Sequence, residues 1–227
     1  MTLGAADVAA RLQHTNVRPD ATRTEIERLL AECVEHRLAG AMVNPIWVPF
    51  ATEALAGTGV MVCTAIDFPM GGGTTGSVAR AASEAREAGA DQLDVMTKVG
   101  WLKSGMEAEY RDHLAAVVGA FQDRPVKAML EAALLTAEEL GRAVDLCADA
   151  GIAYVKNSSG FGGGDASPEL VATLFALAEG RVQVKASGGI RTFDQALALI
   201  EAGAALLGSS ASVAIVAGGP AAGENGY

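Results

Sequence analysis

Apolar residues are arranged along this chain in two alternating patterns. Some form short continuous runs such as Val60 to Ile66, which is typical of strands that are buried on both faces of a sheet. Between these runs, apolar residues recur at helical spacing, as Leu140, Val144 and Cys147 do within a predicted helix at residues 137–149. The pattern therefore predicts strands and helices that alternate along the chain.

The ends of the predicted helices carry recognisable signals. Thr22 and Glu25 form a capping-box sequence, which predicts that a helix begins there and runs to about residue 40. An Ala-Gly pair closes four of the helices, and each pair is followed at once by a predicted strand. These pairs are Ala39-Gly40, Ala88-Gly89, Ala150-Gly151 and Ala202-Gly203.

Eight strands, each with a following helix, predict a (β/α)8 TIM barrel with a short N-terminal helix at residues 5–12. The predicted strands are residues 13–17, 41–43, 60–66, 92–97, 126–131, 153–157, 182–186 and 205–209. Further helices are expected near residues 46–56, 75–88, 107–121, 168–179 and 193–202. We expect residues 1–218 to form a single domain and residues 219–227 to form a flexible tail.

Composition agrees with this fold and narrows the choice of partners. Half of the 227 residues are apolar, 27 are glycine and only 5% are aromatic, which suits alanine-rich helices on a parallel sheet. A net charge of −10 argues against nucleic acid and anionic membranes as partners. With neither a signal peptide nor an apolar run of membrane-spanning length, the chain is expected to be cytoplasmic. The three cysteines lack metal-ligand spacing, so we expect reduced core cysteines and no metal site.

Two similar segments, Val155–Gly160 and Val184–Gly189, both read Val-Lys-x-Ser-x-Gly. Their lysines, Lys156 and Lys185, stand near the ends of consecutive predicted strands and should be neighbours in a parallel sheet. A cation beside an amine lowers the pKa of that amine and makes it a usable nucleophile at neutral pH. The alternative is a pair of solvent-facing lysines, and the symmetry of the two segments does not tell the lysines apart.

Functional groups in such barrels gather at the C-terminal ends of the strands. Asp94 lies in an apolar strand, where an unpaired carboxylate is costly, so we expect it to face a cation inside the barrel. A buried salt bridge without a catalytic role is the alternative. Strand alternation predicts that Lys127 and Glu131 share a direction, and structural and functional roles are both open for them.

A phosphate site is predicted after the seventh and eighth strands, where barrels often bind phosphate through loops and a short helix. Gly188 and Gly189 follow the seventh strand, and Gly208, Ser209 and Ser210 end the eighth. Glycines allow backbone N–H groups to approach an anion. A third glycine-rich segment, Gly160 to Gly164, follows the sixth strand.

Taken together, these residues resemble the deoxyribose-phosphate aldolase family, class I aldolases that cleave 2-deoxyribose 5-phosphate to acetaldehyde and glyceraldehyde 3-phosphate. The resemblance runs from about Gln13 to Gly218, and its most specific motif is the run Val184 to Arg191. The other matching segments are His14-Thr15, Val43-Asn44-Pro45, Phe68-Pro69, Leu102-Lys103-Ser104-Gly105, Leu134-Leu135-Thr136, and Lys156 with Ser158 and Gly160.

The resemblance implies that Lys156 forms the Schiff base, that Lys185 is the cation keeping it uncharged, and that Asp94 is the acid/base group. The predicted substrate and phosphate contacts are Thr15, Lys127, Ser158, Gly160, Gly188, Gly189, Gly208, Ser209 and Ser210. It also implies a small phosphorylated sugar or aldehyde as substrate, no metal or other cofactor, and a homo-oligomer, with a dimer favoured.

The chain departs from the family pattern at several positions that bear on the substrate. The departures are Gln13 for aspartate, Lys98 for asparagine, Ala132 for threonine, Asn157 and Ser159 for two threonines, and Ala211 for serine. Tyr227 ends the chain, as a tyrosine ends some relatives. Two rival functions therefore stay open, a lysine aldolase with a different carbonyl substrate and a non-catalytic barrel that binds phosphorylated metabolites. An isomerase is less favoured, because it needs a carboxylate or cysteine base.

Overall fold

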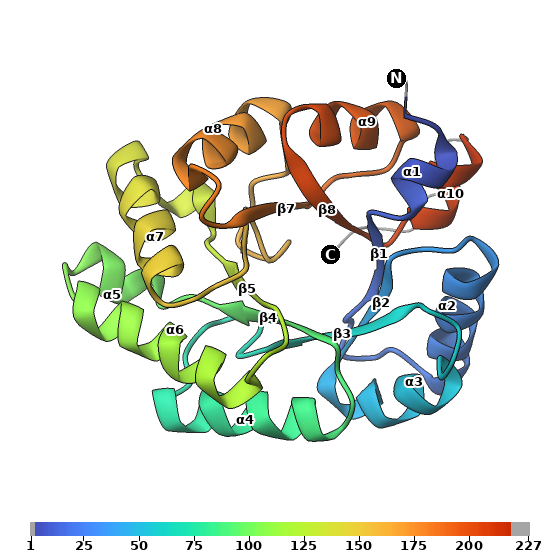
Figure 1. The fold of residues 1–227 in the computed structure, drawn as a ribbon, viewed down its shortest axis with the longest axis horizontal. Helices are drawn as coiled ribbons and strands as arrows, with labels where there is room; N and C mark the ends of the chain where they lie inside the picture. Colours follow the sequence, from blue (N-terminus) through green and yellow to red (C-terminus); the bar gives the residue numbers. More distant parts are fainter. Residues whose placement is uncertain (1–2, 219–227) are drawn as a thin grey trace.

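The computed structural model describes residues 3–218, in which eight parallel strands close into a barrel with helices around it (Figure 1). Each strand pairs with the next in the chain, and β8 pairs with β1. This closure confirms the predicted (β/α)8 barrel. The expectations for the tail and Tyr227 lie outside the described residues. The strands are β1 (Leu12–Asn16), β2 (Gly40–Val43), β3 (Met61–Ile66), β4 (Gln92–Met96), β5 (Val126–Met129), β6 (Tyr154–Lys156), β7 (Gln183–Ser187) and β8 (Ala204–Ser209).

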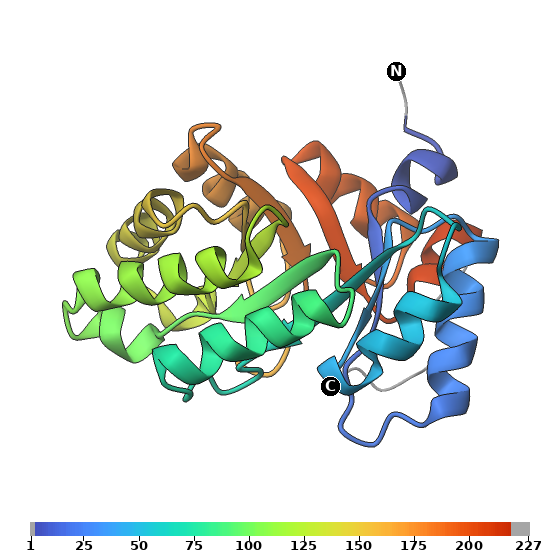
Figure 2. The ribbon, with the colours of Figure 1, turned by 60° about the horizontal axis from the view of Figure 1, so that its bottom comes forward.

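The helices form the outer layer of the molecule, and each predicted helix is present. They are α1 (Ala5–Ala9), α2 (Arg23–Glu35), α3 (Val48–Ala54), α4 (Thr75–Glu87), α6 (Glu107–Phe121), α7 (Ala137–Asp149), α8 (Pro168–Ala178), α9 (Phe193–Glu201) and α10 (Ser212–Ala217). The short α1 precedes the barrel and packs against α9 and α10 (Figure 2).

The helix predicted at residues 46–56 is divided into η1 (Pro45–Trp47) and α3, and two short helical segments were not predicted, α5 (Val99–Lys103) and η2 (Ala132–Leu134). Each lies in a connection that follows a strand at the C-terminal end of the barrel. With five and three residues, the last two are too short to show a helical repeat of apolar positions, which is why the hydrophobic pattern does not reveal them.

Side-chain caps define where several helices begin. The predicted capping box is present at α2, where the Thr22 hydroxyl accepts from the Glu25 N–H and the Glu25 carboxylate accepts from the Thr22 N–H at 2.7 Å. Thr136 and Thr192 cap α7 and α9 in the same way. Helix N-termini follow strand C-termini in this fold, so these caps also stabilise the loops on the side of the barrel where a site is expected.

Apolar side chains fill two separate regions. The larger cluster lies between the strands and the helices and contains Cys33 and Cys147, whereas a smaller cluster inside the barrel contains Met42, Met96 and Met129. All three cysteines are buried and unpaired, as expected for reduced core residues. Within residues 3–218, no helix combines the length and the apolar character needed to cross a membrane.

Two of the Ala-Gly helix ends differ in the space around the glycine, which provides a matched test. Gly89 and Gly151 both have positive φ, but a Cβ at Gly89 would lie 2.5 Å from the side chain of Thr52, whereas a Cβ at Gly151 would lie no closer than 3.5 Å to Val118. Thr52 also donates to the Ala88 carbonyl, so it has little freedom to move away.

We therefore expect Gly151→Ala to lower the free energy of unfolding by about 1 kcal/mol, through backbone strain alone. Gly89→Ala should cost about 2 kcal/mol or more, because overpacking is added to the strain. Urea denaturation of the two variants measures the difference. Equal losses would show that Thr52 does not restrict this turn.

Candidate active site

Asp94, on β4, is completely buried inside the barrel and contacts three lysines. Its Oδ1 lies 3.0 Å from Lys127 Nζ, and its Oδ2 lies 2.7 Å from Lys185 Nζ and 3.2 Å from Lys156 Nζ. This arrangement confirms that Asp94 faces cations inside the barrel. Burial alone would raise the pKa of Asp94, but the three ammonium groups outweigh it and hold that pKa well below its usual range. The carboxylate is therefore ionised at neutral pH.

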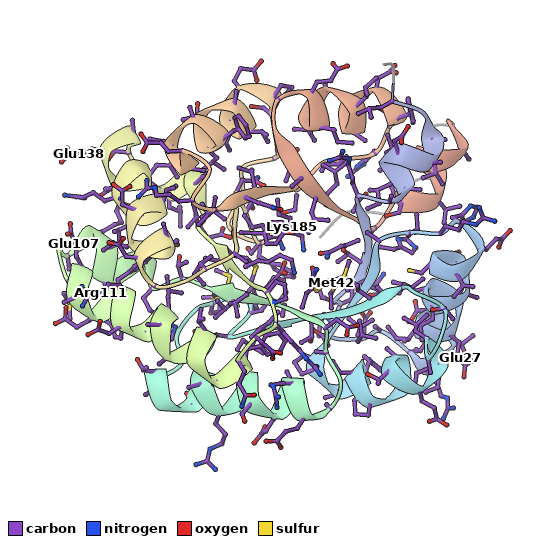
Figure 3. The ribbon with its side chains drawn as sticks, viewed as in Figure 1. Glu27, Met42, Glu107, Arg111, Glu138 and Lys185 are labelled. Carbon is purple, nitrogen blue, oxygen red and sulfur yellow. The ribbon has the colours of Figure 1, made fainter. Side chains whose placement is uncertain are left out.

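Strand register brings these charges together. Lys156 on β6 pairs directly with Lys185 on β7, as predicted from the two similar segments, and Asp94 on β4 pairs directly with Lys127 on β5. The two pairs lie at different heights along the barrel, because Lys127 is level with Tyr154, two residues before Lys156. Figure 3 shows Lys185 pointing into the centre of the ring of strands.

The two paired lysines differ in exposure. Lys185 is 1% exposed, whereas Lys156 is 8% exposed, so an incoming carbonyl compound reaches Lys156 more readily. Burial lowers the pKa of Lys185 to about 7, and the charges of Lys156 and Lys127 act in the same direction while Asp94 opposes them. Lys185 is thus the enclosed partner and Lys156 the accessible one, a distinction that the sequence symmetry concealed.

Gln13 on β1 completes the surroundings of Lys185. Its Oε1 accepts from Lys185 Nζ at 2.6 Å, and its Nε2 donates to Gln92 Oε1 at 2.7 Å. The opposite ends of the amide have different partners, which sets its orientation with the oxygen toward the lysine. Because an amide carries no charge, Asp94 is the one carboxylate that contacts Lys185 among the residues the structure describes.

The segments that follow the two lysines are joined by hydrogen bonds. Asn157 donates to the Ser187 carbonyl at 2.9 Å and accepts from the Ser187 N–H at 2.8 Å. The Ser187 hydroxyl donates to the Ser158 carbonyl, and the Ser158 hydroxyl accepts from the Gly160 N–H and donates to the Gly163 carbonyl. Asn157, which departs from the family pattern, therefore braces β6 against β7.

Glu131 lies apart from the charged cluster. Strand β5 ends at Met129, and Glu131 has a left-handed backbone with φ of +52°, so strand alternation does not extend to it. The predicted common direction of Lys127 and Glu131 is therefore wrong. The Glu131 carboxylate accepts from the Ser159 N–H, whereas Lys127 has no exposed surface and donates to Asp94.

Lys98 belongs to a second buried ion pair, which the sequence did not reveal. It donates to the Asp67 carboxylate and to the carbonyls of Gly71 and Gly73, at 2.8 and 2.6 Å. The loop held in this way borders a cavity of about 500 Å³, to which the charged cluster around Asp94 does not contribute. The apolar side chains in the wall of the cavity are those of Pro69, Met70, Met96, Val99, Trp101, Leu134 and Phe161.

Two of the predicted substrate contacts, Thr15 and Gly208, lie on strands β1 and β8. Thr15 stands two residues after Gln13 on β1 and therefore shares its direction, and its hydroxyl donates to the Gln13 carbonyl. A Cβ at Gly208 would lie 3.4 Å from Lys185 Cε, so glycine there leaves room for the lysine side chain.

Gly188, Gly189 and Ser210 lie in the loops after β7 and β8, and Ser209 is the last residue of β8. Gly188 and Gly189 both have positive φ, and Ser210 is exposed. The Ser209 hydroxyl is buried and joins the two loops by donating to the Ile190 carbonyl at 2.7 Å and accepting from the Ala211 N–H at 3.0 Å. No group of three His, Cys, Asp or Glu side chains suited to a metal ion occurs between residues 3 and 218.

The sequence is similar over most of its length to proteins named deoxyribose-phosphate aldolase. It is 47% identical to the one from Thermosynechococcus vestitus over 208 residues, which cover 91% of this chain and 94% of the relative. It is 40% identical to the one from Staphylococcus carnosus over 212 residues, covering 93% and 96%. The fold matches that of the tetrameric deoxyribose phosphate aldolase from Aeropyrum pernix with a TM-score of 0.87, at 29% identity and covering 94% and 91% of the two chains. No family model matches the chain.

The contact between Gln13 and Lys185 leads to a titration experiment. Gln13→Glu places a negative charge where the amide oxygen now accepts from Lys185, so the pKa of Lys185 should rise from about 7 by about one unit or more. NMR of ¹³C-labelled lysine measures the midpoint, with Lys185→Arg used for assignment. Gln13→Met is the uncharged control, and identical midpoints in the Glu and Met variants would contradict the prediction.

Asp94→Asn tests how much free energy of unfolding is lost when the three buried lysines no longer have a carboxylate beside them. We expect a loss of about 3–5 kcal/mol in the free energy of unfolding at pH 7, because buried ammonium groups are left uncompensated. Without the carboxylate, the pKa of Lys185 in the folded variant should fall further below its value in the unfolded chain. The unfolded chain then binds more protons than the folded variant, so the free energy of unfolding rises with pH.

The deficit relative to the parent protein should therefore shrink between pH 7 and about pH 9. Urea denaturation at both pH values measures it, with Asp145→Asn as a control that removes an exposed ion pair to Arg181. A deficit that is the same at both pH values would count against the electrostatic explanation.

Proposed function

We propose that this chain, which belongs to the deoxyribose-phosphate aldolase family of carbon–carbon lyases, reversibly cleaves 2-deoxyribose 5-phosphate through an imine on Lys156. The products would be acetaldehyde and glyceraldehyde 3-phosphate. The observation that carries the proposal is the direct pairing of two buried lysines that share one carboxylate oxygen, of which Lys156 is the more exposed, at 8% against 1% for Lys185. A nucleophilic amine next to a cation is what imine chemistry at neutral pH requires.

The chemistry proceeds in two halves. The Lys156 amine attacks the sugar carbonyl, and loss of water from the carbinolamine gives an iminium ion. When the β-hydroxyl loses its proton, the electrons of the adjacent carbon–carbon bond move into the iminium, releasing glyceraldehyde 3-phosphate and leaving an enamine. Protonation of the enamine carbon and addition of water then release acetaldehyde and restore the lysine.

The neighbouring charges suit the proton transfers in this sequence. Asp94 is ionised and contacts both lysines, so it is placed to stabilise the iminium and to exchange protons with the amine. Lys185, with a pKa of about 7, gives and takes a proton readily near neutral pH. Lys127 is the third cation that keeps Asp94 ionised.

The substrate would lie across the C-terminal end of the barrel. We place the sugar hydroxyls near Thr15 and the phosphate near Gly188, Gly189 and Ser210, because loops after the seventh and eighth strands are common phosphate sites in this fold. The tetrameric relative from Aeropyrum pernix also supports a homo-oligomer for this chain.

A lysine aldolase for a different carbonyl substrate is the second candidate. It is favoured by the apolar cavity beside the Lys98–Asp67 pair, which offers space for a group that deoxyribose phosphate does not carry. Activity measured with a panel of apolar aldehydes and phosphorylated sugars separates the two candidates.

Trapping the imine tests the mechanism directly. Borohydride added in the presence of acetaldehyde should convert the imine to a stable ethylamine, and mass mapping should find the ethyl group on the peptide containing Lys156. Lys156→Arg should form no adduct, whereas Lys185→Arg should still form one on Lys156, because its positive charge remains. Label on Lys185 would reverse the two roles, and failure to trap any carbonyl compound would refute imine catalysis.

A further inference from the structure

Glu131 has two features that oppose folding. Its backbone is left-handed, with φ of +52°, which is uncommon for residues other than glycine. Its side chain is buried, and Oε2 has no hydrogen-bond partner among residues 3–218. Strained backbone and unpaired buried oxygens are typical of groups that a structure holds in place for binding or catalysis.

The Glu131 carboxylate binds the segment that follows Lys156. Its Oε1 accepts from the N–H of Ser159, a residue that is itself buried. A Cβ built on Gly162 would collide with Glu131 Oε2 and lie 2.9 Å from Cδ, so the loop passes directly against the carboxylate. Gly162 is not among the glycines with positive φ, and position 162 therefore needs glycine for space and not for a left-handed backbone.

The same loop is bonded to the segment in which we place the substrate phosphate. The Ser158 carbonyl accepts from the Ser187 hydroxyl at 2.8 Å, and the Ala166 N–H donates to the Gly188 carbonyl at 3.0 Å. The loop after β6 is thus joined to the glutamate that follows β5 and to the loop that follows β7. A shift at the start of the loop after β6 would be transmitted to the phosphate end of the substrate.

The position of Lys156 does not depend on this carboxylate. The Lys156 carbonyl accepts from the Leu130 N–H at 2.9 Å, and the Asn157 carbonyl accepts from the Ala132 N–H at 2.8 Å. These backbone bonds do not involve the Glu131 side chain. Loss of the carboxylate should therefore move the loop and leave the reacting amine in place.

We propose that Glu131 is a positioning residue that fixes the loop after β6 through the Ser159 N–H, so that the phosphate end of the substrate meets a preformed site. The inference rests on the proposed aldol reaction, and it concerns substrate binding and not the chemical step. Binding to a preformed loop avoids the entropic cost of ordering that loop. Its loss therefore raises KM and leaves kcat almost unaltered.

The first test compares KM and kcat for 2-deoxyribose 5-phosphate in two variants of similar side-chain size. Glu131→Met has no acceptor oxygen and should raise KM about tenfold, with kcat changed by less than about twofold, because the buried Ser159 N–H loses its partner. Glu131→Gln keeps an acceptor oxygen and should restore KM to within about twofold of the parent value. Borohydride trapping with acetaldehyde, which carries no phosphate, should label Lys156 equally in all three proteins.

Gly162→Ala tests the same contact from the side of the loop. The added Cβ should displace the Glu131 carboxylate and raise KM by a similar factor, and it should add little to the effect of Glu131→Met. Asp91→Ala is the matched control, because Asp91 Oδ2 also accepts from a backbone N–H, that of Val62 at 2.8 Å, but lies before the N-terminal end of β4. It should leave KM unaltered.

An unchanged KM in Glu131→Met or Gly162→Ala would overturn the inference, as would a loss of imine trapping in Glu131→Met. The same conclusion would follow if Glu131→Gln were as impaired as Glu131→Met, or if Asp91→Ala raised KM equally.

If the parent protein forms no imine and cleaves no sugar phosphate, the proposed function fails, and Glu131 is tested by binding. Inorganic phosphate, followed through the amide NMR signal of Gly188, should bind about fivefold more weakly to Glu131→Met than to Glu131→Gln. Equal affinities in the two variants, or no binding to the parent protein, would reject the role of Glu131.

Discussion

The interior of this barrel depends on one carboxylate, Asp94, which balances three buried lysines. Ammonium groups inside a protein are costly unless an opposite charge lies close by, and all three lysines contact this one carboxylate, Lys127 at Oδ1 and the other two at Oδ2. Since three positive charges face one negative charge, the cluster favours the loss of a proton. Burial and the charges of Lys156 and Lys127 accordingly lower the pKa of Lys185 to about 7, although Asp94 opposes them. The arrangement that makes the cluster costly is therefore the one that makes it useful for chemistry.

Different parts of the fold control how exposed the lysines around Asp94 are and where they lie. The strands set the heights of the charged groups, because β4 to β7 are paired in a fixed register. Gln13 on β1 accepts from Lys185 and donates to Gln92 on β4, and the Asn157–Ser187 bonds hold the segments after both lysines. The lysines around Asp94 are thus placed by paired strands, whereas the glycine-rich segments after β6 and β7 are loops joined by hydrogen bonds.

Several departures from the family pattern have structural partners. Lys98 is paired with Asp67, and Asn157 is bonded to both backbone groups of Ser187. Gln13 is oriented by Gln92 and Lys185 on its two sides. The contact between Lys156 and Asp94 is present alongside these residues.

By itself, the sequence determined the alternation of strands and helices, the closed barrel that follows from eight such units, and the neighbouring positions of Lys156 and Lys185. These features depend on local periodicity and on equivalent positions in consecutive units, both of which are visible along the chain. Local alternation failed at Glu131, where the backbone leaves the strand, and at α5 and η2, which are too short to show a repeat. Tertiary structure alone decided that Asp94 reaches three lysines, that Lys156 is more accessible than Lys185, and that the Glu131 carboxylate lies against Gly162. Closure of the barrel and packing of its loops set these distances, because they join residues that are far apart in the chain.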